Sequence, residues 1–146
     1  MNNHPTKTIP VKNTVKDCII IDIPTIKDHR GNLAVIENGI LPFKMQRVYY
    51  IFNIPAGAYR GAHAHKHETG FMIAISGSFK VLLDDGIQKK EVLLNRPDKG
   101  LLIPTGIWRE IKDFSQGSVC LVVNSSPYNE ADYIRDYDEF LTYFKK

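Results

Sequence analysis

The sequence predicts an all-β fold, a sandwich or barrel of antiparallel strands followed by one short C-terminal helix. The chain has 146 residues, of which 43% are hydrophobic, enough for a single domain with a sizeable core. Short runs of strand-forming residues follow one another closely, with turn signals rather than helices between them. This pattern is typical of a two-sheet sandwich or barrel. Apolar residues recur at helical spacing only near the C-terminus.

The elements are predicted in order as follows. Residues 1–17 are polar and contain Pro5 and Pro10, so they form an N-terminal arm that is mobile or docks on a partner. Residues 18–146 form the single domain. The sequence Asp84-Asp85-Gly86 predicts a hairpin with a type I′ turn. The predicted strands are 48–52, the stretch around 60–66, 70–75, 79–83, 87–94, 101–104 and 119–123.

The end of the chain predicts a helix that packs on the domain. An apolar stripe at helix-like spacing supports it. Its members are Tyr133, Tyr137, Phe140, Leu141 and Phe144.

Composition excludes several function classes. The net charge is +3, from 19 basic and 16 acidic residues, which is too mild and too dispersed for nucleic-acid binding. The apolar runs are too short to cross a bilayer, and no secretory leader is visible. Cys18 and Cys120 are therefore expected to be reduced core thiols in a cytoplasmic protein.

The sequence Arg60-Gly61-Ala62-His63-Ala64-His65-Lys66 holds the most informative feature, a pair of histidines two residues apart. On a strand, residues at this spacing project from the same face. Two imidazoles aimed at one place indicate either a metal site or acid–base chemistry. The third interpretation is that both histidines are barrel-interior or surface residues without a functional role, held by hydrogen bonds.

A metal site needs a third and usually a fourth ligand. His67 continues the alternation, but three such histidines spread over about 13 Å of extended chain. A turn of the form Pro-x-Gly-x-x-His would supply the missing ligand from a second strand. Here Pro104–Arg109 ends in arginine, which cannot ligate. His4 and His29 have no context that places them nearby, so acid–base chemistry is favoured.

Acid–base chemistry on an anionic substrate needs cations and a hydrogen-bond donor. Tyr49 shares a strand face with Arg47, whereas Tyr50 points the other way, so Tyr49 is the favoured inward phenol. Its alternative role is core packing. Arginine matches phosphate oxygens with a planar fork, and the alternative for each cation is a solvated surface charge. The candidate substrate-binding cations are Arg30, Arg47, Arg60, Lys66 and Arg109.

Several segments together resemble the FdtA/WxcM-like sugar 3,4-ketoisomerases, which are cupins. The resemblance covers about residues 18–141, and the segments around His63 and Tyr133 are its most specific parts. The matching segments are 30–33, 47–52, 60–66, 83–86, 106–110 and 133–138.

The resemblance implies a cupin, or jelly-roll, β-barrel of two antiparallel sheets acting as a homodimer. It implies conversion of dTDP-4-keto-6-deoxy-D-glucose to the 3-keto isomer, which an aminotransferase then converts to a 3-amino sugar for O-antigen lipopolysaccharide and other cell-surface glycans. It implies no metal and no cofactor. The family's two catalytic histidines fall on His63 and His65, and its nucleotide-sugar arginines on Arg47 and Arg60. Family members differ from one another at the positions of Arg30 and Arg109, and they also differ in whether the C4 hydroxyl of the product is axial or equatorial. The configuration at C4 therefore stays open.

In this reaction His65 is expected to be the carbon base and His63 the proton shuttle, although the sequence allows the reverse. Tyr49 or a cation would stabilise the enediolate oxygen. Three other functions remain open: a nucleotide-sugar epimerase of the same barrel type, a metal-dependent cupin, and a non-catalytic sugar-binding cupin. The His–Asp pair used by such epimerases is not visible in the sequence.

Overall fold

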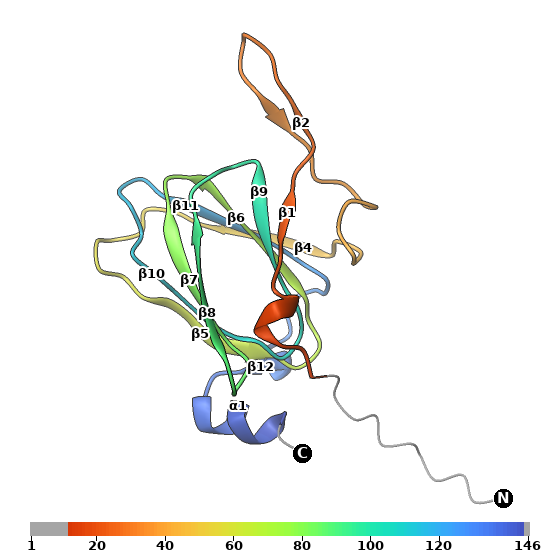
Figure 1. Cartoon of the computed structure of the whole chain (residues 1–146), viewed down its shortest axis with the longest axis vertical. Helices are drawn as coiled ribbons and strands as arrows, with labels where there is room; N and C mark the ends of the chain where they lie inside the picture. The colour runs from red at the N-terminus through yellow and green to blue at the C-terminus, as the bar shows by residue number, and fades with distance from the viewer. Residues whose placement is uncertain (1–11, 145–146) are drawn as a thin grey trace, which may run out of the picture.

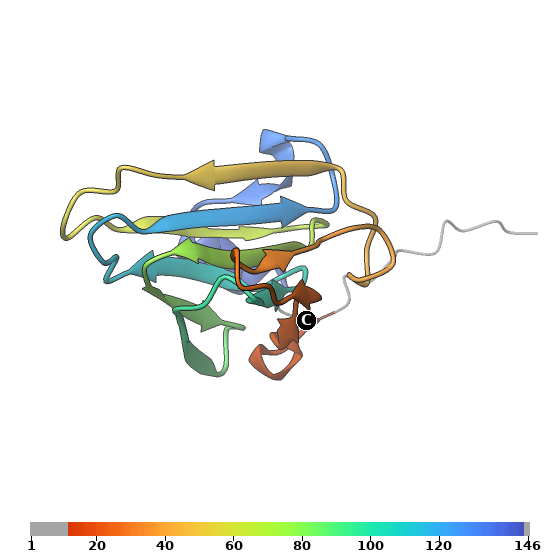
Figure 2. The same cartoon turned by 90° about the horizontal axis from the view of Figure 1, so that it is seen from above.

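The computed structural model describes residues 12–144 and has two five-stranded antiparallel sheets packed face to face (Figures 1 and 2). The first sheet has the order β1 (Ile20–Asp22), β9 (Lys99–Ile103), β6 (Gly70–Ser76), β11 (Val119–Asn124) and β4 (Arg47–Ile51). The second has the order β12 (Tyr133–Ile134), β5 (Arg60–His65), β10 (Trp108–Lys112), β7 (Phe79–Asp84) and β8 (Lys89–Leu94). The all-β, two-sheet prediction is confirmed.

The core lies between the two sheets, because alternate residues of each strand project inward. Cys18 and Cys120 are both fully buried there as free thiols, as the sequence predicted. The main buried cluster includes Met72, Ala74, Phe79, Val81, Leu83, Leu101, Ile103, Ile107, Ile111 and Val122.

Every strand predicted from the sequence is present, but β1, β10, β12 and the two short strands at 25–26 and 33–34 were not predicted. The prediction treated Pro104–Arg109 as a turn, whereas Trp108–Lys112 is a central strand paired with both β5 and β7. The hairpin at Asp84–Gly86 is present, but its turn is not type I′. Only Gly86 has a positive φ there, 91°, while type I′ needs two such residues.

The C-terminal helix is shorter than its apolar stripe predicted. Helix α1 is Tyr137–Tyr143, and Tyr133 lies outside it in β12. Asp136 caps the helix, because its side chain accepts a hydrogen bond from the amide of Glu139 at 2.9 Å. Phe140 and Phe144 pack with Trp108 on the outer side of the second sheet.

Residues 12–17 of the predicted arm lie against the domain. The 3₁₀ helix η1 (Val15–Asp17) buries Val15, whose amide donates to Asp85 at 2.9 Å. Residues 1–11 of that arm lie outside the described residues. A two-stranded hairpin, β2 (Thr25–Ile26) and β3 (Leu33–Ala34), projects from the barrel at the top of Figure 1.

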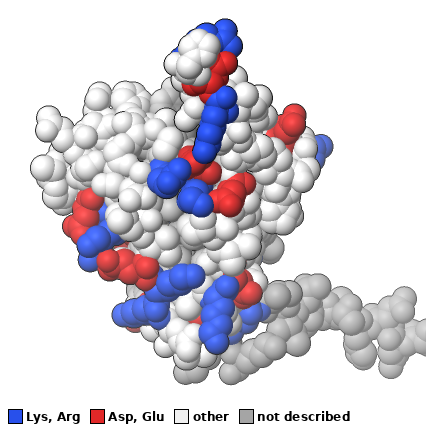
Figure 3. Space-filling model, turned by 45° about the horizontal axis from the view of Figure 1, so that its top comes forward, with Lys and Arg blue, Asp and Glu red and all other residues white. Residues whose placement is uncertain are grey.

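Basic and acidic side chains lie close to one another at several places on the face drawn in Figure 3, and uncharged residues cover the rest of it. Ion pairs of the described residues include Arg96 with Asp98 at 2.8 Å and Lys99 with Asp22 at 2.6 Å. Among residues 12–144, no helix is long and apolar enough to cross a membrane.

Candidate active site

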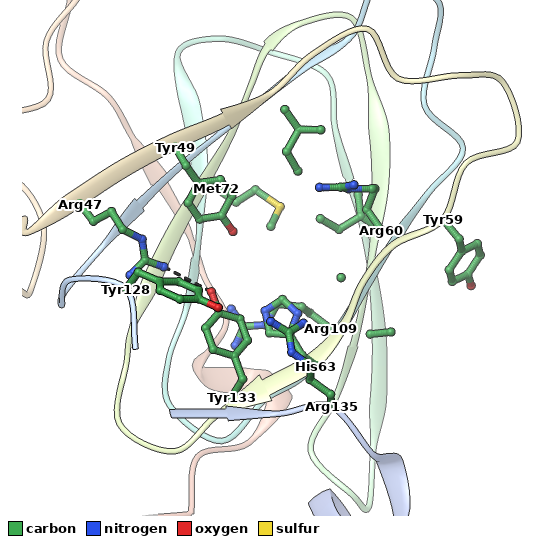
Figure 4. A pocket seen from close by; sticks show the side chains of 14 residues that line it. Arg47, Tyr49, Tyr59, Arg60, His63, Met72, Arg109, Tyr128, Tyr133 and Arg135 are labelled. Atoms are coloured by element: carbon green, nitrogen blue, oxygen red, sulfur yellow. Dashed lines mark hydrogen bonds between the residues drawn. The ribbon is translucent and has the colours of Figure 1, made fainter. Parts of the chain in front are cut away.

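A cleft of about 670 Å³ opens between the two sheets, a size typical of small-molecule sites. Five strands, β4, β5, β6, β10 and β12, and residues next to β5 and β12 supply its walls, and side chains converge on it from both sheets (Figure 4). The lining residues are Arg47, Tyr49, Ile51, Tyr59, Arg60, Gly61, Ala62, His63, Met72, Arg109, Ile111, Tyr128, Tyr133 and Arg135.

A β-bulge in β5 turns Arg60 toward this cleft. Arg109 of β10 pairs with His63, but the next residue of β10 pairs with Gly61, so Ala62 is an extra residue. Gly61 and Ala62 both have positive φ, 84° and 58°. In a regular strand, residues 60 and 63 would face opposite sides. The bulge shifts this alternation by one residue, and both side chains line the cleft.

His63 and His65 project inward together, as the sequence predicted. Their ring centroids are 4.9 Å apart, with the rings nearly perpendicular. His63 lines the cleft, and His65 lies beside it, 3% exposed. Burial, followed by the charge of Arg109, lowers the pKa of His63 to about 3. The same two causes lower the pKa of His65. Both rings are therefore neutral near pH 7, the form in which imidazole accepts a proton.

His65 is held by Asp132, at the end of the 3₁₀ helix η2 (Glu130–Asp132). His65 Nδ1 lies 3.0 Å from Asp132 Oδ2. Strand β12, which follows Asp132, pairs with β5 and places Tyr133 opposite His65. The sequence analysis found no His–Asp pair, and this was wrong: the two residues are 67 positions apart, so only the strand pairing brings them together.

A second buried carboxylate lies next to the same imidazole. Glu68 Oε2 is 3.2 Å from His65 Nδ1. Glu68 Oε1 accepts hydrogen bonds from Arg47 Nη1 and from the Ser126 hydroxyl, each at 2.9 Å. Burial raises the pKa of Glu68, and the contacts with Ser126 and Arg47 oppose that rise. Glu68 therefore joins the imidazole to the arginine at the edge of the cleft.

His65, Glu68 and Asp132 form a buried group whose candidate ligand atoms lie within 4.8 Å of one another. Each of the four carboxylate oxygens already has a nitrogen or hydroxyl neighbour in the protein. The Arg47 guanidinium, 2.9 Å from Glu68, places a positive charge where a metal ion would need to bind. The arrangement is that of a hydrogen-bonded network around an imidazole.

Two of the four tyrosines that line the cleft, Tyr49 and Tyr133, are half-buried. Tyr49 points inward, while Tyr50 is 61% exposed on the opposite face of β4. This agrees with the predicted orientation. Burial raises the pKa of Tyr49 to about 12. Tyr133 packs against the rings of His63 and His65, at centroid distances of 4.9 and 4.4 Å. Burial also raises the pKa of Tyr133, so both phenols keep their protons at neutral pH.

The predicted cations occupy different environments. Arg109 is 4% exposed and donates from Nη2 to the Ile107 carbonyl at 3.0 Å. Its Nε has no partner among residues 12–144, and no carboxylate there forms an ion pair with it. Arg47 is held by Glu68, the Ser126 carbonyl and Tyr133. Arg60 lines the cleft and forms no ion pair within the described residues.

Two predicted binding residues are not brought to the cleft. Arg30 lies in the β2–β3 turn, 80% exposed, and pairs with Asp28 at 2.8 Å. Lys66 follows the end of β5, and its ammonium lies over the ring of Tyr143 at 5.4 Å. Neither belongs to the cleft lining in this chain. His67 lies in a bend after β5, and its side chain is 84% exposed.

The segment from Tyr128 to Arg135 was not recognised as part of the site. Tyr133 was assigned to the helix, although Asp136 and Glu139 have the spacing of a helix start. That signal would have placed Tyr133 outside the helix. Arg135 stacks on Tyr133 at 4.3 Å and pairs with Glu130 at 2.6 Å. Tyr128, 62% exposed at the rim, also contacts Glu130.

The fold and this site define a cupin-like barrel with a polar cleft and a buried imidazole pair. The family model described as "FdtA: WxcM-like, C-terminal" matches residues 16–145. The chain belongs to this family.

Two relatives are similar over most of their length. The chain is 42% identical to the TDP-4-oxo-6-deoxy-α-D-glucose-3,4-oxoisomerase of Aneurinibacillus thermoaerophilus, covering 87% of this chain and 92% of that protein. The crystal structure of the WlaRB TDP-quinovose 3,4-ketoisomerase from Campylobacter jejuni is 47% identical, with a TM-score of 0.82. That match covers 86% of this chain and 98% of the other.

A third similar structure contains a sugar nucleotide. It is a His→Asn variant of the 3,4-ketoisomerase QdtA from Thermoanaerobacterium thermosaccharolyticum, in complex with TDP-4-keto-6-deoxyglucose. It is 38% identical, with a TM-score of 0.83, over 85% of this chain and 91% of that one. The 3'-monoepimerase ChmJ from Streptomyces bikiniensis is 15% identical, with a TM-score of 0.68, over 80% of this chain and 67% of that one. That likeness shows a shared fold alone.

Proposed function

We propose that this protein is a nucleotide-sugar 3,4-ketoisomerase that converts dTDP-4-keto-6-deoxy-D-glucose to its 3-keto isomer without a metal or other cofactor. The observation that supports it most is the pair of neutral imidazoles beside two protonated phenols, in a cleft whose buried Arg109 guanidinium pairs with no carboxylate among residues 12–144. Such an arrangement moves protons and stabilises a developing oxyanion. The names of the similar proteins point to the same substrate class.

The reaction is a transfer of protons through an enediolate. His65 takes the proton from C3, and the electrons of the broken C–H bond move toward the C4 carbonyl. The resulting enediolate carries its charge on O4. A proton is then delivered to C4 while the C3 hydroxyl loses its own proton and becomes the ketone. His63, at the cleft wall, is the shuttle that moves protons between these positions.

Arg109 and Tyr49 are suited to stabilising the enediolate. Each faces the cleft, and a buried guanidinium without a carboxylate partner interacts strongly with a nearby negative charge. Tyr49 keeps its proton and therefore donates a hydrogen bond. A preorganised donor of this kind contributes about 3 kcal/mol to transition-state stabilisation.

The cleft mouth is suited to holding the dTDP group. Arg60 is available for the diphosphate, since it has no ion-pair partner among residues 12–144. Arg47 also lines the cleft, but its donors are largely occupied by Glu68, the Ser126 carbonyl and Tyr133. We assign Arg60 as the principal diphosphate contact and Arg47 as a secondary one. Lys66 and Arg30 would contact substrate only through a movement or a second subunit.

The test is incubation with dTDP-4-keto-6-deoxyglucose in D₂O, followed by trapping with a 3-aminotransferase and NMR of the product. We expect a 3-amino sugar with deuterium at C4. Retention of the original hydrogen at C4 would indicate a hydride shift and contradict the proton mechanism. A product with inverted C3 or C5 and the keto group still at C4 would indicate an epimerase. Binding of dTDP without turnover would indicate a non-catalytic sugar-binding protein.

The metal-dependent alternative makes a separate prediction. Such an enzyme would lose activity in a chelator and regain it with a divalent ion. We expect the same turnover before and after treatment with EDTA, measured with the aminotransferase trap. Activity that depends on added metal would contradict the proposed mechanism.

We further propose that the protein is a cytoplasmic homodimer. The outer face of β4 supports the dimer, because β4 is an edge strand with Val48, Tyr50 and Phe52 each more than half exposed. Edge strands with apolar faces are commonly covered by a partner. The free thiols of Cys18 and Cys120 support a reducing compartment. Sedimentation equilibrium of the wild type and of Tyr50→Arg tests the dimer, and a monomeric wild type would refute it.

A further inference from the structure

Tyr49 and Tyr133, the two half-buried phenols of the cleft, reach it from opposite sheets. Tyr49 lies on β4 of the first sheet, and Tyr133 lies on β12 of the second. The hydroxyl of Tyr133 accepts a hydrogen bond from Arg47 Nη2 at 3.4 Å (Figure 4). Because a guanidinium only donates hydrogen bonds, the phenol keeps its own hydrogen for another acceptor in the cleft.

We propose that Tyr133 is a further catalytic residue, whose hydroxyl donates a hydrogen bond to O3 of the sugar, and that Arg47 is the positioning residue that holds this hydroxyl. This inference rests on the proposed ketoisomerase function. It does not depend on which histidine takes the proton from carbon, because it concerns the sugar oxygens.

The reaction requires stabilisation of two sugar oxygens. Loss of the C3 proton places negative charge on O4, and the C3 hydroxyl then gives up its own proton as C3 becomes the ketone. Negative charge therefore develops on O3 as well as on O4. The proposed function assigns Arg109 and Tyr49 to O4, which leaves O3 without a donor. A preorganised phenol on the opposite sheet supplies that donor.

The ring of Tyr133 is fixed beside the two imidazoles. Its centroid lies 4.9 Å from that of His63 and 4.4 Å from that of His65. The guanidinium carbon of Arg135 lies 4.3 Å from the same centroid. The backbone of Tyr133 pairs with that of His65 in the ladder between β12 and β5. The phenol therefore keeps a fixed position relative to His63, the imidazole that lines the cleft.

Arg47 is itself held in one orientation. Its Nη1 donates to Glu68 Oε1 and to the Ser126 carbonyl, each at 2.9 Å, and its side chain is half-buried. Burial raises the pKa of Tyr133, and the charge of Arg47 opposes that rise. The phenol stays protonated at pH 7, and the hydrogen bond that it accepts from a cation polarises its O–H bond and makes it a stronger donor.

The first test is Tyr133→Phe, which removes the hydroxyl and keeps the ring beside the imidazoles. Losing one preorganised donor to a developing oxyanion should lower kcat about 10²- to 10³-fold. We expect KM to change less than about threefold, because the donor acts mainly in the transition state. The aminotransferase-trapped assay measures both constants, and calorimetric titration with dTDP confirms that the variant is folded and binds the nucleotide.

The matched control is Tyr137→Phe. The Tyr137 hydroxyl also has a charged partner, since it donates to Asp84 at 2.6 Å, but Tyr137 does not line the cleft. We expect its kcat to stay within about threefold of the wild type. Full activity in folded Tyr133→Phe would refute the catalytic role of this phenol. An inactive wild type would instead refute the proposed function, so the two failures are distinguishable.

The second test identifies the oxygen that Tyr133 contacts. A dTDP-linked 3,6-dideoxy-4-keto sugar has no O3, but a C3 hydrogen can still exchange with solvent through the enolate at O4. NMR in D₂O measures this exchange. We expect its rate in Tyr133→Phe to stay within about threefold of the wild type, whereas Tyr49→Phe should slow it about 10²-fold or more. A slowing in Tyr133→Phe as large as its loss of kcat would overturn the assignment to O3.

The positioning role of Arg47 is tested by a double-mutant cycle. Arg47→Lys keeps a charge beside Glu68 but lacks the fork that provides separate nitrogens for Glu68 and Tyr133. If Arg47 acts through the phenol, this substitution should lower kcat about tenfold in the wild type and less than about threefold in Tyr133→Phe. KM is compared separately, because Arg47 is also a secondary contact of the diphosphate. Equal losses of kcat in the two backgrounds would refute the positioning role.

Discussion

The two halves of strand β5 differ sharply, although they belong to one continuous strand. Residues 60–62 are irregular and mostly exposed, with two successive positive φ angles and an extra residue opposite β10. Residues 63–65 are regular and buried, with β10 on one side and β12 on the other. The first half presents a guanidinium at the cleft mouth, and the second half places His63 in the cleft wall and His65 beside it.

This difference shows how one strand serves both binding and catalysis. The diphosphate is expected to bind Arg60 at an exposed position, where the guanidinium stays hydrated until the ligand binds. Proton transfer from carbon needs neutral imidazoles in a dry site, where electrostatic interactions are strong. The bulge separates the two environments within six residues. If this view is correct, substitutions in the buried half affect kcat, and substitutions in the exposed half affect KM or stability.

The largest expected effect is that of His65→Asn. Removing the general base should lower kcat about 10³-fold or more, while the affinity for dTDP stays within about twofold. The measurements are the aminotransferase-trapped assay and calorimetric titration with dTDP. His29→Asn is the control, since its side chain is 91% exposed on the hairpin. A variant at position 65 that keeps a tenth of wild-type activity would contradict the division of β5 into two roles.

Arg60→Ala should have the opposite signature. Losing a charge-assisted contact with the diphosphate costs about 1.5–3 kcal/mol, so KM should rise about 10- to 100-fold with kcat changed less than about threefold. Steady-state kinetics measures this change. Arg96→Ala is the control, because Arg96 is an exposed arginine paired with Asp98. An unchanged KM would show that the exposed half of β5 does not bind the substrate.

The sequence alone was enough to predict the barrel and to identify the inward-facing residues of its regular strands. Alternation placed His63, His65 and Tyr49 on inner faces, and the structure agrees. Alternation could not place Arg60, because a bulge depends on how a strand pairs with its neighbour. Arg60 was proposed from its motif, and strict alternation would have turned it away from the cleft.

The other residues that the sequence analysis missed or misplaced also depend on contacts between distant segments. Asp132 reaches His65 through the pairing of β12 with β5, and a two-residue strand has too few residues to show a period. Tyr133 was assigned to the helix because its spacing continued the apolar stripe. Arg30 and Lys66 were expected near the cleft because of their strand or turn positions, and in this chain both lie outside it. Pairing between distant segments is the information that a single sequence does not contain.

A smaller effect concerns acid stability. The pKa of His63 is about 3 in the folded protein and near ~6.5 when unfolded. Between these values the unfolded chain binds a proton that the folded chain does not. The stability contributed by a neutral His63 is thus fully present above pH 6.5 and is lost as pH falls toward 3. At pH 5 the loss is about 2 kcal/mol.

Urea unfolding at pH 7 and pH 5 measures this loss in the wild type and in His63→Gln. We expect the decrease in unfolding free energy between the two pH values to be about 2 kcal/mol smaller in the variant. His29→Gln, at an exposed position, should behave like the wild type. Equal decreases in the wild type and His63→Gln would mean that the buried half of β5 does not keep this imidazole neutral.

The smallest effects come from the bulge itself, where neighbouring residues with similar backbone angles should respond differently. In Gly61→Ala, the new Cβ would lie 3.0 Å from the Arg109 carbonyl oxygen at a positive φ, and a loss of about 1–2 kcal/mol is expected. Ala62→Gly removes the unfavourable conformation of alanine at φ 58° but adds freedom to the unfolded chain, so the two effects should cancel to within about 0.5 kcal/mol. Thermal unfolding measures the stability of both variants.

Because the shift of Gly61 would also displace Arg60, Gly61→Ala should raise KM more than Ala62→Gly does. If both variants matched the wild type in stability and KM, the irregular half of β5 would not be what directs Arg60 into the cleft.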